Sequence, residues 1–102
     1  MADIEQTVLV DRIVALTGDI EHAAALDDWI EASRLVEARS PFLMSLSARQ
    51  SPAALAALRS VIARDAAVMA SAQHSQGALR VEFNAAMGRS KAVGMYHQTA
   101  RL

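Results

Sequence analysis

The chain has 102 residues, a length that fits a single domain. It contains no cysteine, which excludes disulfides, a thiolate zinc site and a cysteine nucleophile. Aromatic residues make up only 4% of the chain and alanine is abundant, so the composition predicts an all-α protein. The acidic start has no basic segment followed by an apolar run, and no apolar stretch is long enough for a membrane span, so we expect a cytoplasmic protein without a membrane partner.

Charge is distributed unevenly along the chain. Residues 1–40 hold nine acidic groups against three basic ones, whereas residues 41–102 hold seven basic groups against two acidic ones. One interpretation is that acidic early helices pack against a basic late helix, and the other is that the basic half binds an acidic partner. Nucleic acid is not expected as that partner, because the basic residues are sparse and Tyr96 is the only aromatic residue of the tail.

The first expected helix covers residues 3–25. Its apolar residues recur every three or four positions and form one stripe, which is typical of an amphipathic helix. They are Leu9, Ile13, Leu16, Ile20 and Ala23. This stripe predicts that one face of the first helix packs into the core.

The second expected helix covers residues 28–47. Either Asp27 or Asp28 can cap its start, because a short carboxylate accepts a hydrogen bond from the first free N–H groups. Pro41 lies inside the helix and predicts a bend or a short break; we favour a bend, since the apolar phase continues beyond it. Three apolar residues follow the proline, 42–44, and successive side chains turn by about 100°, so one of them should face outward.

The third expected helix begins at Ser51-Pro52, a serine cap followed by a proline at the first helical position. The apolar phase then continues to residue 88, so we favour one continuous helix over residues 52–88, with a break near Gln76-Gly77 as the alternative. The tail, residues 89–102, is expected to be frayed or to form a short fourth helix. The predicted fold is therefore an antiparallel helical bundle of three helices, the third being the longest, with a possible short fourth.

Catalytic and metal-binding patterns are weak. None of His22, His74 and His97 has another histidine at ligand spacing on a helix. Asp65 falls on the apolar phase of the third helix, where pairing with an arginine such as Arg39 is favoured over a role as general base. We therefore expect no enzyme activity, no metal and no cofactor.

The second helix carries a spacing that resembles the FliT-type flagellar export chaperones. That family shows an acidic residue before a tryptophan, leucines three and six positions later, an arginine at ten and then a leucine pair. The matching residues here are Asp28-Trp29, Leu35, Arg39 and Phe42-Leu43. Ala32 replaces the first leucine, and Pro41 also departs from the pattern. The resemblance covers residues 5–46.

This resemblance implies a small helical chaperone for flagellar type III export. Such a protein holds the terminal segment of a filament-cap-type protein and delivers it to the export ATPase and gate, and a C-terminal segment competes with the cargo. The expected groove lies between the second and third helices, and its lining residues are Leu35, Phe42, Leu43, Leu46, Leu79 and Phe83. Met95 and Tyr96 are expected in the covering tail. The alternative is a structural or regulatory bundle that self-associates as a homodimer without cargo.

Overall fold

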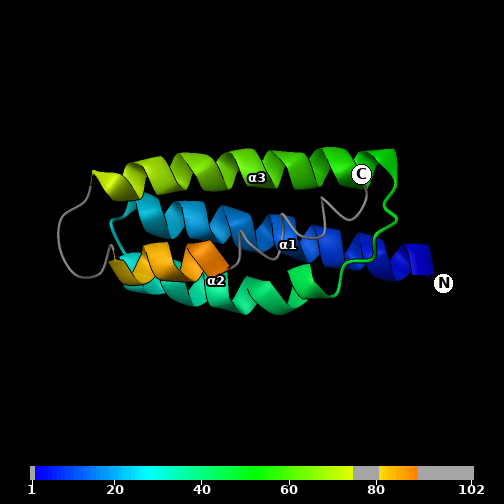
Figure 1. Ribbon diagram of the computed structural model, residues 1–102, viewed down its shortest axis with the longest axis horizontal. Coiled ribbons are helices and arrows are strands. Elements are labelled where there is room, and N and C mark those ends of the chain that lie inside the picture. Colours follow the sequence, from blue (N-terminus) through cyan, green and yellow to red (C-terminus); the bar gives the residue numbers. More distant parts are fainter. Residues whose placement is uncertain (1, 75–80, 90–102) are drawn as a thin grey trace.

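The computed structural model describes residues 2–74 and 81–89, with residues 2–4 described by their backbone alone. Three helices are α1 (Ala2–Ala25), α2 (Trp29–Met44) and α3 (Pro52–Gln73). A short fourth helix covers residues 81–89 (Figure 1). The described ranges contain no strand, so the all-α prediction is confirmed.

Helix α1 forms the centre of the fold, because it packs against both α2 and α3. In Figure 1, α1 lies between α3 and α2, and α1 and α3 run in the same direction while α2 runs in the opposite one. Within the described part of the chain, the backbones of α2 and α3 make no close contact with each other. The arrangement therefore differs from a bundle in which each helix packs on the next.

The turn between α1 and α2 assigns a separate role to each of its two aspartates. Asp27 adopts a left-handed φ of 56° and donates its N–H to Ala24, while the N–H of Asp28 bonds to the carbonyl of Ala23. These two bonds form the Schellman arrangement that ends many helices. The side chain of Asp28 then accepts from the N–H of Glu31 at 3.1 Å and caps α2. Asp28, rather than Asp27, is therefore the N-cap.

Helix α2 continues through Pro41 and ends at Met44, so a break at the proline is ruled out. Pro41 has no N–H to donate to the preceding turn, yet the helix extends one turn further. The prediction for residues 42–44 is confirmed, because Leu43 is buried while Met44 is 63% exposed and faces outward.

Helix α3 begins as expected, since Ser51 accepts from the N–H of Ala54 at 3.0 Å and Pro52 occupies the first turn. The expected continuous helix over residues 52–88 is wrong, because α3 ends at Gln73. The helix over residues 81–89 runs in the opposite direction to α3 (Figure 1). This reversal brings Phe83 and Met87, which a straight rod would leave uncovered, into the core.

The core consists of two clusters of buried side chains. The first joins all four helices, and its larger members are Ile20, Trp29, Leu35, Val36, Val68, Phe83 and Met87. The second joins α1 to the end of α2 and the start of α3, and it consists of Val10, Ile13, Leu43, Leu46, Leu58 and Val61. Helix 81–89 therefore completes only the first cluster.

Candidate functional site

The contact between helix 81–89 and α2 is the most distinctive feature of the described structure. Phe83, Ala86 and Met87 form the buried face of helix 81–89, and each is at most 2% exposed. Phe83 lies edge-on against Trp29, with ring centroids 5.0 Å apart and an interplanar angle of 61°. We call the three residues of α2 that hold this helix, Trp29, Glu37 and Arg39, the docking site.

Two further contacts fix the other end of helix 81–89. The sulfur of Met87 lies 3.8 Å from Nη2 of Arg39, and the guanidinium of Arg89 forms an ion pair with Glu37 at the surface. Phe83, near the start of helix 81–89, contacts Trp29 at the start of α2. Met87 and Arg89, near its end, contact Arg39 and Glu37, which lie further along α2. Helix 81–89 therefore lies parallel to α2, with its apolar face inward and a cation at its C-terminal end.

Each of the two helices in this contact carries a buried polar atom without a partner in the described part of the chain. Trp29 is only 5% exposed, and its indole Nε1 has no hydrogen-bond partner in the described part of the chain. The side-chain oxygen of Asn84, on the docked helix, is also buried and unpaired there. A buried polar group without a partner costs about 1–3 kcal/mol. Helix 81–89 therefore buries its apolar face completely, whereas a polar atom on each of the two helices has no partner among the described residues.

Beneath the docked helix, an ion pair between a fully buried arginine and a partly buried aspartate links α2 to α3. Arg39 is 0% exposed, and its Nη1 and Nη2 donate to the two carboxylate oxygens of Asp65 at 2.9 and 2.8 Å. Nη1 also donates to Oγ1 of Thr17 on α1 at 2.9 Å. The predicted Arg39–Asp65 pair is confirmed. Because both carboxylate oxygens are engaged, Asp65 holds the helices together and is poorly placed to abstract a proton.

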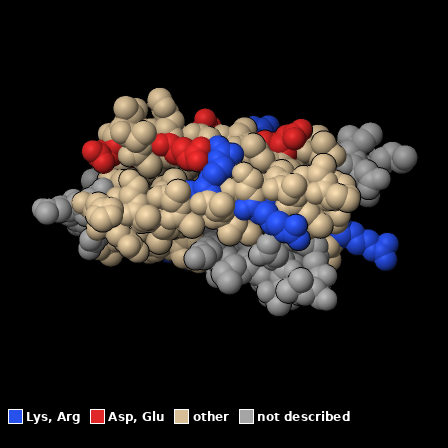
Figure 2. Space-filling view, turned by 90° about the horizontal axis from the view of Figure 1, so that it is seen from above, with Lys and Arg blue, Asp and Glu red and all other residues tan. Residues whose placement is uncertain are grey.

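Two of the surface ion pairs among the described residues connect the acidic part of the chain to the basic part, whereas a third, Glu31–Arg34, lies within the acidic part. Nε of Arg64 donates to Glu21 at 2.9 Å, and this hydrogen bond lowers the pKa of Glu21 while it raises the pKa of Arg64. The pairs Glu21–Arg64 and Glu37–Arg89 each join an acidic residue of the first 40 to a basic residue further on. Figure 2 looks onto the side of the molecule occupied by α3, where basic and acidic side chains are interspersed. This agrees with the interpretation that the charges serve helix pairing.

The residues expected to line a groove are distributed over both core clusters. Leu35 belongs to the first cluster, Leu43 and Leu46 to the second, and Phe42 packs half-buried against the second. Phe83 is part of the helix that covers α2, rather than of a wall between α2 and α3. Leu79, Met95 and Tyr96 lie outside the described residues. The described members are therefore divided between the two clusters, and Leu35 is buried.

The docking site itself was not predicted from the sequence. Trp29 was named only as part of the spacing that resembles the export chaperones, without Phe83 as its partner, and Glu37 was given no role. The spacing of Phe83 and Met87 could have predicted the apolar face of helix 81–89, because residues four positions apart lie on one face of a helix. A break after Gln73 brings that face back onto α2.

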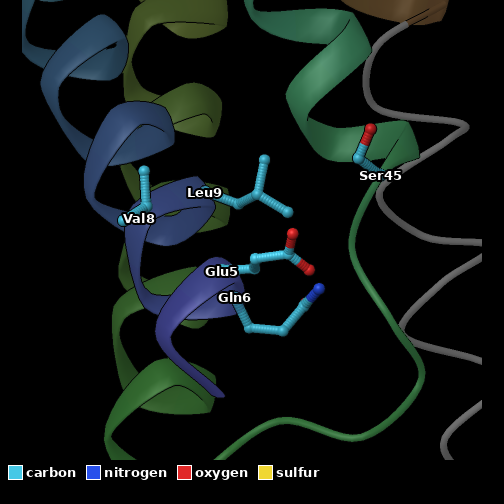
Figure 3. Close-up of a pocket in the computed structure, with 5 residues that line it drawn as sticks. All are labelled: Glu5, Gln6, Val8, Leu9 and Ser45. Atoms are coloured by element: carbon cyan, nitrogen blue, oxygen red, sulfur yellow. The ribbon is translucent and has the colours of Figure 1, made fainter. Parts of the chain in front are cut away.

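A surface hollow of about 450 Å³ lies at the other end of the molecule, lined by Glu5, Gln6, Val8, Leu9 and Ser45 (Figure 3). Its polar groups already have structural partners. Oε1 of Gln6 accepts from the N–H of Ser47 at 3.0 Å, and the hydroxyl of Ser45 donates to the carbonyl of Pro41 at 2.9 Å. The hollow therefore offers little chemistry beyond one carboxylate.

Residues 2–74 and 81–89 contain no group of three acidic or histidine side chains that could hold a metal ion. None of the helices in those ranges combines the length and the apolar character needed to cross a membrane.

No protein-family model, curated protein or solved structure matches this chain. In the structure, Trp29, Leu35, Arg39 and Leu43 of the spacing that resembles the export chaperones are all buried. Their direct effect is on the fold: helix 81–89 contacts Trp29 and Arg39, whereas Leu43 lies in the second cluster, away from that helix.

Proposed function

We propose that this protein is a cytoplasmic helical chaperone of the flagellar type III export kind. It binds and shields the terminal segment of a filament-cap-type protein and delivers that segment to the export ATPase and gate. The observation that carries the proposal is the docking of helix 81–89 on α2, because this helix has the properties of an intramolecular ligand. The spacing from Trp29 to Arg39 supports the choice of this chaperone family.

Helix 81–89 is short, and its contacts to α2 within the described residues include the Phe83–Trp29 ring contact, the Met87–Arg39 contact and the Arg89–Glu37 ion pair. Nine residues are too few for a stable isolated helix, since even alanine-rich helices below about 12–15 residues are marginal in water. Burial of Phe83 and of Met87 contributes about 1.5–3 kcal/mol each. Ordering the segment and leaving Trp29 Nε1 unpaired both oppose that gain. A small free-energy difference then separates the docked and undocked states, and a ligand can shift their populations.

The surface beneath helix 81–89 suits a helical ligand. Undocking exposes the ring of Trp29 and apolar neighbours of the first cluster, a surface of the kind into which an amphipathic helix places its apolar face. An unassembled cap-type subunit exposes such segments, which aggregate unless they are covered. Moderate affinity is sufficient, because the cargo has to be released at the export gate.

A second candidate function is self-association. Ile30 on α2 and Val81 on helix 81–89 are both 61% exposed, although both are large apolar side chains on the two helices that dock together. Self-association through this surface would give a homodimer without cargo. Sedimentation at micromolar protein distinguishes the two functions, because a stable cargo-free dimer favours the second.

The direct test is calorimetric titration of a filament-cap-type terminal segment from the same organism into the full-length chain. We expect one-to-one binding with a negative heat-capacity change, because apolar surface is buried. The variant Arg89→Glu, which places a second carboxylate beside Glu37, should bind the segment more tightly than the wild type. If neither the wild type nor this variant binds the segment, the chaperone proposal is wrong.

A further inference from the structure

Helix 81–89 shows what kind of helix fits the docking site. Its buried face consists of an aromatic residue at 83, a small residue at 86 and a flexible apolar residue at 87. A basic residue follows at 89 and forms an ion pair with Glu37. The bound helix therefore combines one apolar face with one cation at a defined distance from it.

Each of these features meets a complementary group on α2. The aromatic ring of Phe83 contacts the ring of Trp29, and the sulfur of Met87 contacts the guanidinium of Arg39. Arg39 is already paired with Asp65, so its site favours an uncharged, polarisable side chain over a second carboxylate. Glu37 is 49% exposed and favours a cation at the rim. The charge and the shape of the docking site thus specify both ends of the ligand.

We infer that the docking site recognises partner helices by a four-position pattern. The pattern begins with an aromatic residue. A small residue follows three positions after it, methionine or an aliphatic residue four positions after it, and arginine or lysine six positions after it. The partner helix lies parallel to α2 and takes the place of helix 81–89. This inference rests on the proposed function and names the chemistry of the segment that the chaperone binds.

A partner can also provide an interaction that the resident helix lacks. Trp29 Nε1 is buried and has no hydrogen-bond partner in the part of the chain that the structure describes. A partner that places a side-chain oxygen at this nitrogen forms a hydrogen bond that the resident helix does not make. This difference favours exchange of the resident helix for an external one.

The test uses the full-length chain and a fluorescein-labelled alanine–glutamine host peptide. The peptide carries Phe, Ala, Met and Arg at the spacing of residues 83, 86, 87 and 89, and fluorescence anisotropy at low salt measures its binding. The chain variant Phe83→Ala weakens the resident helix, and we expect it to bind the peptide about ten-fold more tightly than the wild type does. If Phe83→Ala fails to fold, the variant Arg89→Glu replaces it. Arg89 and its partner Glu37 are 64% and 49% exposed, so this change weakens docking without disturbing the core.

Two matched peptides test the pattern. Replacing the peptide's Phe by Ala should weaken binding about ten-fold or more. Replacing its Arg by Glu should weaken binding about three-fold, and Glu37→Arg in the chain should reverse that preference. Equal binding of the Phe and Ala peptides, or the same Arg preference on both chains, would overturn the inference. If the pattern peptide binds but the cap-type segment does not, the inference stands and the proposed function fails. If the cap-type segment binds but the pattern peptide does not, the pattern is wrong and the proposed function stands.

Discussion

Phe83 contacts Trp29 edge-on, with the two ring centroids 5.0 Å apart, and this contact joins helix 81–89 to the start of α2. Trp29 is the only tryptophan in the chain. Its fluorescence therefore reports directly on the docking of that helix. Because Trp29 is 5% exposed and its Nε1 has no hydrogen-bond partner among the described residues, we expect the emission of the native protein to be strongly blue-shifted.

The first prediction concerns Phe83→Ala. We expect the emission of Trp29 to shift to the red while helices α1, α2 and α3 remain fully formed. The free energy of unfolding should fall by about 1–3 kcal/mol. A core phenylalanine costs about 3–5 kcal/mol when truncated, but here the loss cannot exceed the free energy of docking. Urea unfolding followed by fluorescence and circular dichroism measures both quantities.

Val81→Ala is the control, because Val81 lies on the same helix but is 61% exposed. It should change stability by less than about 0.5 kcal/mol and leave the emission unchanged. A loss of about 4 kcal/mol or more for Phe83→Ala, with the emission still blue-shifted before global unfolding, would show that helix 81–89 is an inseparable part of the core.

The second prediction concerns the buried ion pair. Asp65→Ala should cost about 3 kcal/mol, because it leaves the fully buried guanidinium of Arg39 without its carboxylate. The double variant Arg39→Met with Asp65→Leu should recover most of that loss, since no buried charge remains. Chemical denaturation of both variants tests this, with Asp19→Ala as the exposed control. A cost below about 1 kcal/mol for Asp65→Ala would mean that water reaches the site.

The third prediction separates global stability from docking by means of two glycines. A Cβ at Gly18 would approach Nη2 of Arg64 at 3.7 Å, an ordinary contact, and a Cβ at Gly88 would meet nothing within 4 Å. Each glycine-to-alanine change should therefore stabilise its own helix by about 0.5–1 kcal/mol. Gly18→Ala should raise the melting temperature, whereas Gly88→Ala should slow hydrogen exchange in residues 81–89. If Gly88→Ala instead raises global stability as much as Gly18→Ala does, the two regions unfold together.

The fourth prediction concerns pH. The hydrogen bond from Arg64 lowers the pKa of Glu21 in the folded state, so the pair stabilises the fold above the ordinary value of 4.5 and loses its effect as pH falls through the lower folded value. Glu21 is 38% exposed, so solvent screens the pair and its contribution stays below about 1 kcal/mol. The stability difference between the wild type and Glu21→Gln should shrink from about pH 7 to about pH 3. A difference that grows on acidification would contradict this assignment.

Local signals in the sequence predicted much of the fold. Asp28 and Ser51 are short polar residues at helix starts, and their caps depend on neighbours three positions away. The pair Arg39–Asp65 could also be predicted, because a carboxylate on an apolar helix face requires a buried cation. These features depend on spacing along a helix, which the sequence displays directly.

The end of α3 and the docking of helix 81–89 could not be predicted in the same way. The apolar phase passes Gln73 without interruption, so periodicity alone favours one long helix. Tertiary packing decides where α3 ends, because Phe83 and Met87 can pack against Trp29 and Arg39 only after the chain reverses direction. The expected groove residues Leu43 and Leu46 lie in the second cluster for a similar reason, since α1 and the start of α3 bury them there.

The central claim is that helix 81–89 and a partner helix compete for one site on α2. Amide hydrogen exchange of the full-length chain, measured with and without the bound cap-type segment, tests it most directly. We predict faster exchange in residues 81–89 when the segment is bound, with unchanged protection at Ile13 and Ile20, which are fully buried in α1. Unchanged or slower exchange in residues 81–89 upon binding would contradict the claim.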